Sequence, residues 1–353
     1  MARKDPVEAL IEQMAPDVAA AFIDSISNIT SDVQIASLIK AIESGDLAGA
    51  LRVINLGSEY FLPLDRAIRG AYEAGGDAIM AGFVSESARQ GAKVTARFDS
   101  RNQLAEQFLK TESAQMIVDI SDPQRVQVTN ALVSGMEQSK APRSVALDIV
   151  GRIDKITGVR TGGIVGLTQG DIDLSNEVYR ILTEEPRKYF IIDRKTGEWK
   201  PRYKGTDRRF DRTVAAAIRN GETISANDAG KIVGKYRNRL LLGRGDTIAR
   251  TELLGTINAA QDHSLEQLID NRSIMRRDIQ NEWDASNDGA TRDSHAFMDG
   301  QIREQGKAYE TGAGFLMLHP GDRSLGAPAE EIINCRCRKI VRIDFLAQLA
   351  RKR

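Results

Sequence analysis

The spacing of hydrophobic residues divides this chain into three regions, and the first is helical. Up to about residue 155, apolar residues recur at every third or fourth position, the period of a helix with one buried face. Helices are predicted over residues 46–56, 63–91, 100–118 and 123–139. Ser44-Gly45-Asp46 is expected to end one helix and start the next, and the segment up to Pro123 to separate two more. Residues 1–155 are therefore interpreted as a helical N-terminal domain.

Residues 156–240 form a mixed region in which a strand pattern interrupts the helices. Residues 189–193 are predicted to form a strand, 194–197 a turn and 198–203 a returning strand. Ser225 is expected to cap a helix over 226–242, and Gly243-Arg244-Gly245-Asp246 to form a turn before another helix. That next helix contains Arg250 and Glu252, which diverge at i,i+2 spacing and are expected to have different partners.

Residues 241–353 combine helix and strand patterns. A helix from Thr291 to about Asp299, closed by Gly300, would put His295 and Asp299 on one face. Residues 332–343 alternate like a strand. The predicted fold class is α+β and predominantly α-helical, with a helical N-terminal region followed by a small C-terminal α+β domain.

The predicted strand over residues 332–343 separates thiols from arginines. Its period of two places Cys335 and Cys337 on one face. The other face carries a row of arginines suited to phosphate, carboxylate or an acidic patch on a partner: Arg336, Arg338 and Arg342.

Composition adds a charge asymmetry and excludes some classes of protein. Residues 1–150 carry 14 Lys/Arg against 20 Asp/Glu, and residues 151–353 carry 35 against 29, although the net charge is zero. Such a split suggests two surfaces with different partners. Two cysteines in 353 residues argue against a disulfide framework and for a reducing compartment. No run of about 18 apolar residues is present, so no membrane partner is expected.

Residues 187–212 are basic and rich in aromatic residues. Ten Lys/Arg face four Asp/Glu there, with five aromatic residues between them. Basic side chains neutralise phosphates and aromatic rings stack on bases, so one interpretation is nucleic-acid contact. The other is a solvated hairpin whose aromatic rings pack on neighbouring helices. The candidate contact residues are Arg194, Lys195, Lys200, Arg202, Lys204, Arg208 and Arg209.

Both cysteines and two of the three histidines lie between residues 283 and 338. Zinc held by His295, His319, Cys335 and Cys337 would use suitable ligand types, although a C-x-C pair is weaker evidence than paired C-x-x-C motifs. A Cys335–His295 nucleophile pair is an alternative on residue types. A disulfide within C-x-C would be strained in an extended strand. We expect buried free thiols packed on the 291–299 helix and no cofactor, with zinc as the alternative.

Five sequence blocks between about residues 245 and 340 resemble the phage Mu F-type head-morphogenesis (minor head) protein family. The residues that carry the resemblance are Arg250, Thr251, Glu252, Trp283, Asp288, Arg292, His295, Asp299, Gly300, Pro320, Gly321, Asp322, Pro328, Asn334, Cys335, Arg336 and Cys337. The resemblance implies membership of the family's core pattern for these residues and no known catalytic role.

The resemblance also implies a function. Members of this family are minor capsid proteins of tailed phages or prophages, so the chain is expected to be a structural protein of the virion and not an enzyme. The expected partners are the portal protein, the major capsid or scaffold protein and double-stranded DNA. The expected location is the capsid interior near the portal, reached from the host cytoplasm during assembly. The alternatives are a metal-dependent hydrolase, an ADP-ribosyltransferase-like enzyme that uses Arg250 and Glu252, and a non-specific nucleic-acid-binding protein.

Overall fold

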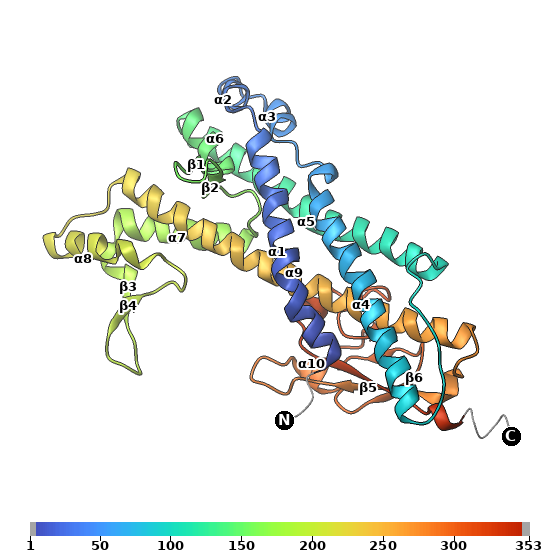
Figure 1. Ribbon diagram of the computed structural model, residues 1–353. Helices are drawn as coiled ribbons and strands as arrows, with labels where there is room; N and C mark the ends of the chain where they lie inside the picture. Colours follow the sequence, from blue (N-terminus) through green and yellow to red (C-terminus); the bar gives the residue numbers. More distant parts are fainter. Residues whose placement is uncertain (1–4, 348–353) are drawn as a thin grey trace. The chain divides into compact units, whose positions relative to one another are not determined.

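Helices account for most of the chain in the computed structural model, which describes residues 5–347 (Figure 1). The α-helices are α1 (Pro6–Asp32), α2 (Ile35–Glu43), α3 (Leu47–Ile54), α4 (Leu62–Arg89), α5 (Gln103–Glu137), α6 (Pro142–Val150), α7 (Gln169–Glu184), α8 (Asp211–Asn220), α9 (Ala226–Asp270), α10 (Asp293–Ala296) and α11 (Ala329–Ile332). Short 3₁₀ turns are η1 (Ser58–Phe61), η2 (Pro186–Tyr189), η3 (Arg208–Phe210) and η4 (Arg276–Asp278). The prediction of a predominantly helical α+β protein is confirmed.

The strands are short and pair antiparallel. They are β1 (Arg152–Ile153), β2 (Arg160–Thr161), β3 (Phe190–Ile192), β4 (Trp199–Pro201), β5 (Ile279–Asp284), β6 (Ile302–Glu304), β7 (Tyr309–Glu310), β8 (Leu316–Met317) and β9 (Arg338–Ile343). β5 is the central strand of the three-stranded sheet, in the order β6-β5-β9. In that sheet Trp283 lies opposite Lys339. The predicted hairpin is confirmed as β3 and β4.

The chain packs into two compact units that each combine separate stretches of sequence. Unit 1 comprises the chain up to Ala21, Leu64–Met116 and the chain from Asp246 onward, and unit 2 comprises Phe22–Pro63 and Ile117–Gly245. Helices α1, α4, α5 and α9 contribute residues to both units. Each unit therefore contains residues from both sides of the boundaries predicted at residues 155 and 240.

The core of unit 1 connects the C-terminal sheet to α4 and α9. One cluster of buried side chains comprises Met80, Ala92, Val94, Leu265, Leu268, Ile274, Ile279 and Phe345. A second comprises Tyr72, Ala105, Leu109 and Ala260. Because α9 contributes to both clusters, it is the framework on which the C-terminal segments are assembled.

The core of unit 2 lies between α7, α8 and the first half of α9. Its buried residues include Val178, Tyr189, Val214, Ile232 and Tyr236. As predicted, Ser225 caps α9: its Oγ accepts a hydrogen bond from the backbone N–H of Asp228 at 3.2 Å.

Two predicted helix breaks are wrong because tertiary packing outweighs local propensity. Helix α5 runs through Pro123, and residues on both sides of the proline, Ile120 and Gln124, are buried at helical spacing. The Gln124 amide also bonds the 166–167 backbone: Nε2 donates to the carbonyl of Leu167 at 2.5 Å and Oε1 accepts from the N–H of Gly166 at 2.6 Å. These contacts offset the cost of a proline within a helix.

Helix α9 likewise runs through residues 243–246, where a turn was predicted. Each glycine costs a helix about 1 kcal/mol relative to alanine. Between the two glycines, Arg244 donates a hydrogen bond to the carbonyl of Gly166 at 2.7 Å and lies over the ring of Phe22. These contacts hold the segment helical. Among residues 5–347, no helix combines the length and apolar character that crossing a bilayer requires.

Candidate functional site

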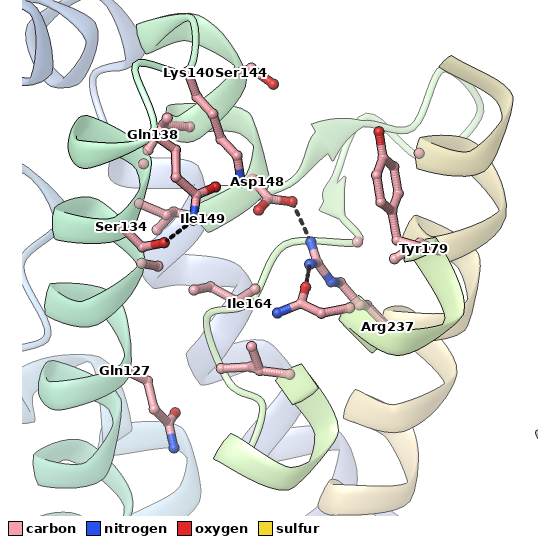
Figure 2. A pocket seen from close by; sticks show the side chains of 18 of the residues that line it. Gln127, Ser134, Gln138, Lys140, Ser144, Asp148, Ile149, Ile164, Tyr179 and Arg237 are labelled. Atoms are coloured by element: carbon pink, nitrogen blue, oxygen red, sulfur yellow. Dashed lines mark hydrogen bonds and ion pairs between the residues drawn. The ribbon is translucent and has the colours of Figure 1, made fainter. Parts of the chain in front are cut away.

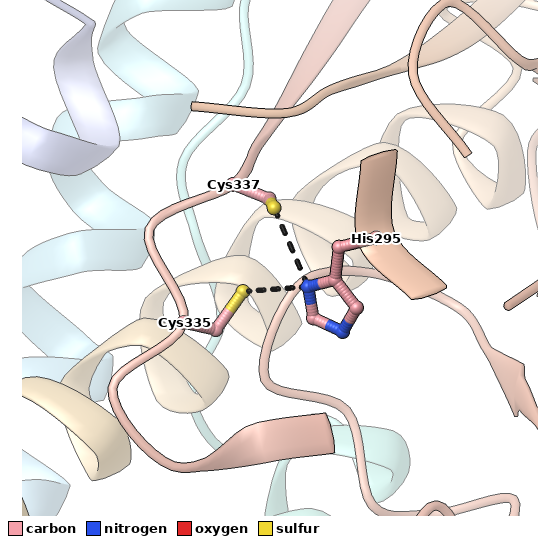
Figure 3. Close-up of side chains that lie close together, drawn as sticks. All are labelled: His295, Cys335 and Cys337. Atoms are coloured by element: carbon pink, nitrogen blue, oxygen red, sulfur yellow. Dashed lines mark hydrogen bonds between the residues drawn. The ribbon is translucent and has the colours of Figure 1, made fainter. Parts of the chain in front are cut away.

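The structure brings one histidine and both cysteines together in unit 1. His295 lies on α10, and Cys335 and Cys337 lie in the loop between α11 and β9 (Figure 3). The Sγ atoms are 3.5 Å and 3.4 Å from the same ring nitrogen, Nδ1 of His295. All three side chains are buried, at 1–3 % exposure. As predicted, both cysteines are buried, and no disulfide joins them.

The predicted partner of His295 is not the observed one. Helix α10 covers only Asp293–Ala296, with Arg292 as its N-cap, and is much shorter than the predicted Thr291–Asp299. Gly300 donates its N–H to the carbonyl of Trp283 at 2.8 Å, so the chain leaves the helix before Asp299. Asp299 instead accepts hydrogen bonds from the backbone N–H of Ala285 and from Asn287. The expectation that His295 and Asp299 share a face is therefore wrong.

Glu331 is the carboxylate that faces His295. Its Oε2 lies 2.9 Å from Nε2 of His295, which is within ion-pair distance, although the angle at Nε2 is not that of a good hydrogen bond. The same oxygen accepts a hydrogen bond from the hydroxyl of Ser294 at 2.8 Å. The Glu331 side chain is 8 % exposed. A buried carboxylate at Nε2 favours the tautomer with its proton there, which leaves the lone pair of Nδ1 directed at the thiols.

The strand predicted over 332–343 begins later than expected. Pro328 is the N-cap of α11, whose first turn contains Glu330 and Glu331, and Asn334 adopts a left-handed conformation at φ 55°. β9 therefore starts at Arg338, and the two cysteines face His295 from a loop instead of a strand.

Each of the two thiols shifts the pKa of the other. A hydrogen bond from Cys335, reinforced by His295, lowers the pKa of Cys337 against the opposing effect of burial. The same hydrogen bond, followed by burial, raises the pKa of Cys335 well above its ordinary value. The pair therefore shares its protons unequally, and Cys337 is the thiol that ionises first.

Most other residues that carry the family resemblance join separate segments of unit 1. Thr251 on α9 accepts a hydrogen bond from the N–H of Asn334 at 3.1 Å. Glu252 bonds Arg323 at 2.8 Å, and Arg250 makes a two-bond ion pair with Glu8. The prediction that Arg250 and Glu252 have different partners is confirmed.

The block around Pro320 lies against α9 through backbone contacts. Asn258 donates a hydrogen bond to the carbonyl of Pro320 at 3.1 Å. Asp322 is buried and accepts from the N–H groups of Leu318 and Ser324. Gly321 has φ +83°, and a Cβ there would lie 2.8 Å from the backbone nitrogen of Gly255. A glycine is thus required for both the conformation and the close approach.

Replacing Gly321 with alanine is expected to lower the free energy of unfolding by about 2–3 kcal/mol, because the side chain adds a backbone clash to an unfavourable φ. Gly326→Ala is the matched control: Gly326 also has φ +83°, but a Cβ there meets nothing within 4 Å. The control is expected to cost only about 1 kcal/mol. Urea unfolding followed by circular dichroism measures both, and equal losses would show that the approach to α9 is unimportant.

The three arginines predicted to form a row suited to phosphate, carboxylate or an acidic patch on a partner are paired with acidic residues of this chain. Arg336 bonds Asp288 at 2.9 Å, and Arg338 and Arg342 pair with Asp284 and Glu282. Because each guanidinium already has a carboxylate, the row is not an open phosphate site.

His319 does not join the cysteines. It is 6 % exposed, and its Nδ1 lies 3.1 Å from the carbonyl of Pro320. Among the described residues, the group of clustered metal-ligand atoms is His295, Cys335 and Cys337. The proposal of His319 as a fourth ligand is therefore wrong.

Comparison with known proteins agrees with the sequence resemblance. Residues 208–340 match the family model described as Phage Mu protein F like protein. This part of the chain is Mu F-like. The match extends the resemblance, drawn from residues 245–340, back through α9 and α8. No curated protein and no solved structure matches the chain.

The family points to phage head morphogenesis and to a structural minor capsid protein, with the virion and the host cytoplasm during assembly as its places of action.

The Mu F-like region contains buried polar residues that local periodicity did not reveal. Glu331 faces His295, and Lys339 has a completely buried side chain paired with Asp262. The alternation of β9 could have revealed Lys339, since it occupies the same predicted face as Cys335 and Cys337.

The basic hairpin of unit 2 is exposed, whereas most of its aromatic residues are core residues. Tyr189 is buried, and Phe190, Tyr203 and Phe210 pack against the unit 2 core. Trp199 is 65 % exposed. All the basic candidate residues are exposed. Lys200, Arg208 and Arg209 pair with Asp193, Asp211 and Asp207. The interpretation that the aromatic residues pack inward is confirmed for four of the five.

A pocket of about 730 Å³ lies in unit 2 (Figure 2). At one side of it Arg237, 5 % exposed as a residue, donates hydrogen bonds to Asp148, Ser175 and Asn176. This arginine is already neutralised by Asp148. The pattern residues of the Mu F-like region do not line the pocket.

Proposed function

We propose that this protein is a minor capsid protein of a tailed phage or prophage that enters the head during assembly and associates there with the portal protein. The observation that carries the proposal is the match of residues 208–340 to the Mu F-like family. Its expected place is the capsid interior near the portal. The excess of acidic residues in 1–150 favours protein partners such as the portal, the major capsid protein or scaffold.

A structural role also agrees with how the pattern residues are used. Arg250 and Glu252, which an ADP-ribosyltransferase-like enzyme would direct at a substrate, are engaged with Glu8 and Arg323. Asp299, which a hydrolase would place beside His295, bonds the backbone of Ala285 instead. These residues fasten segments of unit 1 to one another, which is a structural task.

Virion analysis tests this proposal. A phage or induced prophage that encodes the chain is purified on a density gradient, and the protein is quantified in filled heads by mass spectrometry. We expect a few copies per head and chemical cross-links to the portal protein. Absence from purified heads, or heads of normal composition and infectivity after deletion of the gene, would contradict the proposal.

We further propose that the hairpin contacts the phosphates of packaged double-stranded DNA. Arg194, Lys195 and Lys204 are exposed, and no acidic partner is found for them among residues 5–347. Free cations can each replace a counterion on a phosphate, so binding is expected to weaken linearly with the logarithm of salt concentration. Trp199 at the hairpin adds an exposed aromatic surface.

Changing Arg194, Lys195 and Lys204 together to glutamine is expected to reduce the slope of log K against log salt. Each phosphate that is no longer neutralised makes this negative slope less steep by about 0.9, which is roughly 2.7 for the three cations. Fluorescence anisotropy with a labelled duplex at several salt concentrations measures the slope. A triple variant of Arg180, Arg219 and Lys231 changes the net charge equally and should keep the slope. If the two triple variants behave alike, the hairpin does not bind the DNA.

A further inference from the structure

Two sulfur atoms converge on a single nitrogen in the buried group of His295, Cys335 and Cys337. Figure 3 shows both thiols directed at Nδ1 of the imidazole. A neutral imidazole nitrogen without a proton has one lone pair, which lies in the ring plane and accepts one hydrogen bond well. Two sulfurs at nearly equal distances from one nitrogen are also the arrangement in which a single metal ion can bind all three atoms.

The distances are those that a tetrahedral zinc ion would impose. With Zn–S bonds of about 2.3 Å and Zn–N bonds of about 2.0–2.1 Å, a sulfur and a nitrogen ligand lie roughly 3.5 Å apart. The observed Sγ–Nδ1 distances are 3.5 Å and 3.4 Å. The ligand atoms of the three side chains all lie within 4.8 Å of one another. One ion can therefore reach them all with little movement.

The surroundings are also those of a metal site. Glu331 lies 2.9 Å from the far nitrogen of His295, the position in which a carboxylate orients a metal-binding imidazole. Trp283 packs against the imidazole edge-to-face, with ring centroids 5.5 Å apart. This packing fixes the ring and helps to exclude water.

We propose that Nδ1 of His295 and the Sγ atoms of Cys335 and Cys337 bind one zinc ion. Binding replaces the thiol protons, which pass to solvent, and involves no change of oxidation state. The ion would crosslink α10 to the loop between α11 and β9, two segments that the chain separates by 40 residues. Because its ligands are buried and come from two separate segments, the ion would stabilise the folded Mu F-like region. The proposal does not depend on the role in head assembly.

Metal analysis of the purified full-length chain tests the site directly. The protein is produced with a tag that lacks histidine, kept reduced and dialysed, and its metals are measured by mass spectrometry. We expect one zinc per chain. Replacement by cobalt is expected to give thiolate charge-transfer absorption in the near ultraviolet and the visible bands of a tetrahedral ion. Folded protein that retains neither metal would overturn the proposal, as would stoichiometric iron or a Cys335–Cys337 disulfide.

Variants of neighbouring glutamates keep the test independent of folding defects in cysteine variants. Glu331→Gln is expected to lower zinc affinity, measured by competition with a chelator, by 10- to 100-fold. Glu330→Gln makes the same change one residue away at an exposed position and should leave the affinity unchanged. His319→Gln should also leave one zinc per chain. Equal affinities for the two glutamate variants, or loss of zinc on changing His319, would contradict the proposed ligand set.

Discussion

Replacing Lys339 with methionine is expected to lower the free energy of unfolding by about 3–5 kcal/mol. The Lys339 side chain is completely buried on β9 and pairs with Asp262 of α9. Burial by itself raises the pKa of Asp262, but Lys339 and His319 outweigh it and hold that pKa below its ordinary value. Without Lys339, the carboxylate of Asp262 keeps the weaker effect of His319 and polar partners such as Gln305, whose Nε2 donates to it at 3.1 Å. A largely buried charge that has lost its main partner is costly, so the sheet should detach from α9 more easily.

The pH dependence of this loss separates charge from packing. Asp262 in the wild-type protein has a lowered pKa, so the pair's contribution is present at neutral pH and is lost as the pH falls through that pKa. In Lys339→Met the carboxyl is buried without its cation and binds a proton more readily. The difference in unfolding free energy between the two proteins should therefore shrink as the pH is lowered from neutrality towards the ordinary pKa of an aspartate.

The double variant Asp262→Leu with Lys339→Met is the control for this experiment. It removes both charges and leaves apolar groups of similar size, a change that is often neutral or stabilising for a buried pair. We expect it to recover most of the loss, measured by urea unfolding at pH 7. A double variant as unstable as Lys339→Met would show that the volume of the lysine, and not its charge, matters here.

The helical character of the chain and several element ends could be predicted from sequence because they depend on local chemistry. Asp46 accepts the N–H of Gly49 as a helix cap, and the β3–β4 hairpin forms where strand-forming residues flank a turn. The breaks predicted at Pro123 and at Gly243-Gly245 were wrong for the opposite reason. There, contacts with residues distant in sequence, the 166–167 backbone above all, decide the conformation.

The composition of the candidate site could be predicted, but most of its pairings could not. The sequence indicated that His295, Cys335 and Cys337 act together, because all three lie between residues 283 and 338. In the structure their side chains are close to one another. Local periodicity then paired His295 with Asp299, whereas the carboxylate that faces it is Glu331, 36 residues further along the chain. Helical spacing carries no information about such a partner, because α10 ends after one turn and the path of the loops determines the neighbour.

The second large effect is expected at Trp283, whose replacement by alanine should lower the free energy of unfolding by about 3–5 kcal/mol. Trp283 has no exposed surface and packs edge-to-face between His295 and Tyr309, with ring centroids 5.5 Å and 5.2 Å away. Alanine would leave a cavity between the central strand β5 and the imidazole. Urea unfolding followed by circular dichroism measures the loss.

Two further variants show which property of Trp283 matters. Its indole N–H has no hydrogen-bond partner among residues 5–347, so Trp283→Phe removes packing volume but no hydrogen bond seen there and is expected to cost about 1–1.5 kcal/mol. Trp199→Ala changes the other tryptophan, which is 65 % exposed, and should stay within about 0.5 kcal/mol of the wild type. Because the indole holds the His295 ring, Trp283→Ala should also weaken zinc binding while Trp199→Ala should not. If Trp283→Ala unfolds like Trp199→Ala, the Mu F-like region is not assembled around this side chain, and the packing that places His295 beside the thiols must come from elsewhere.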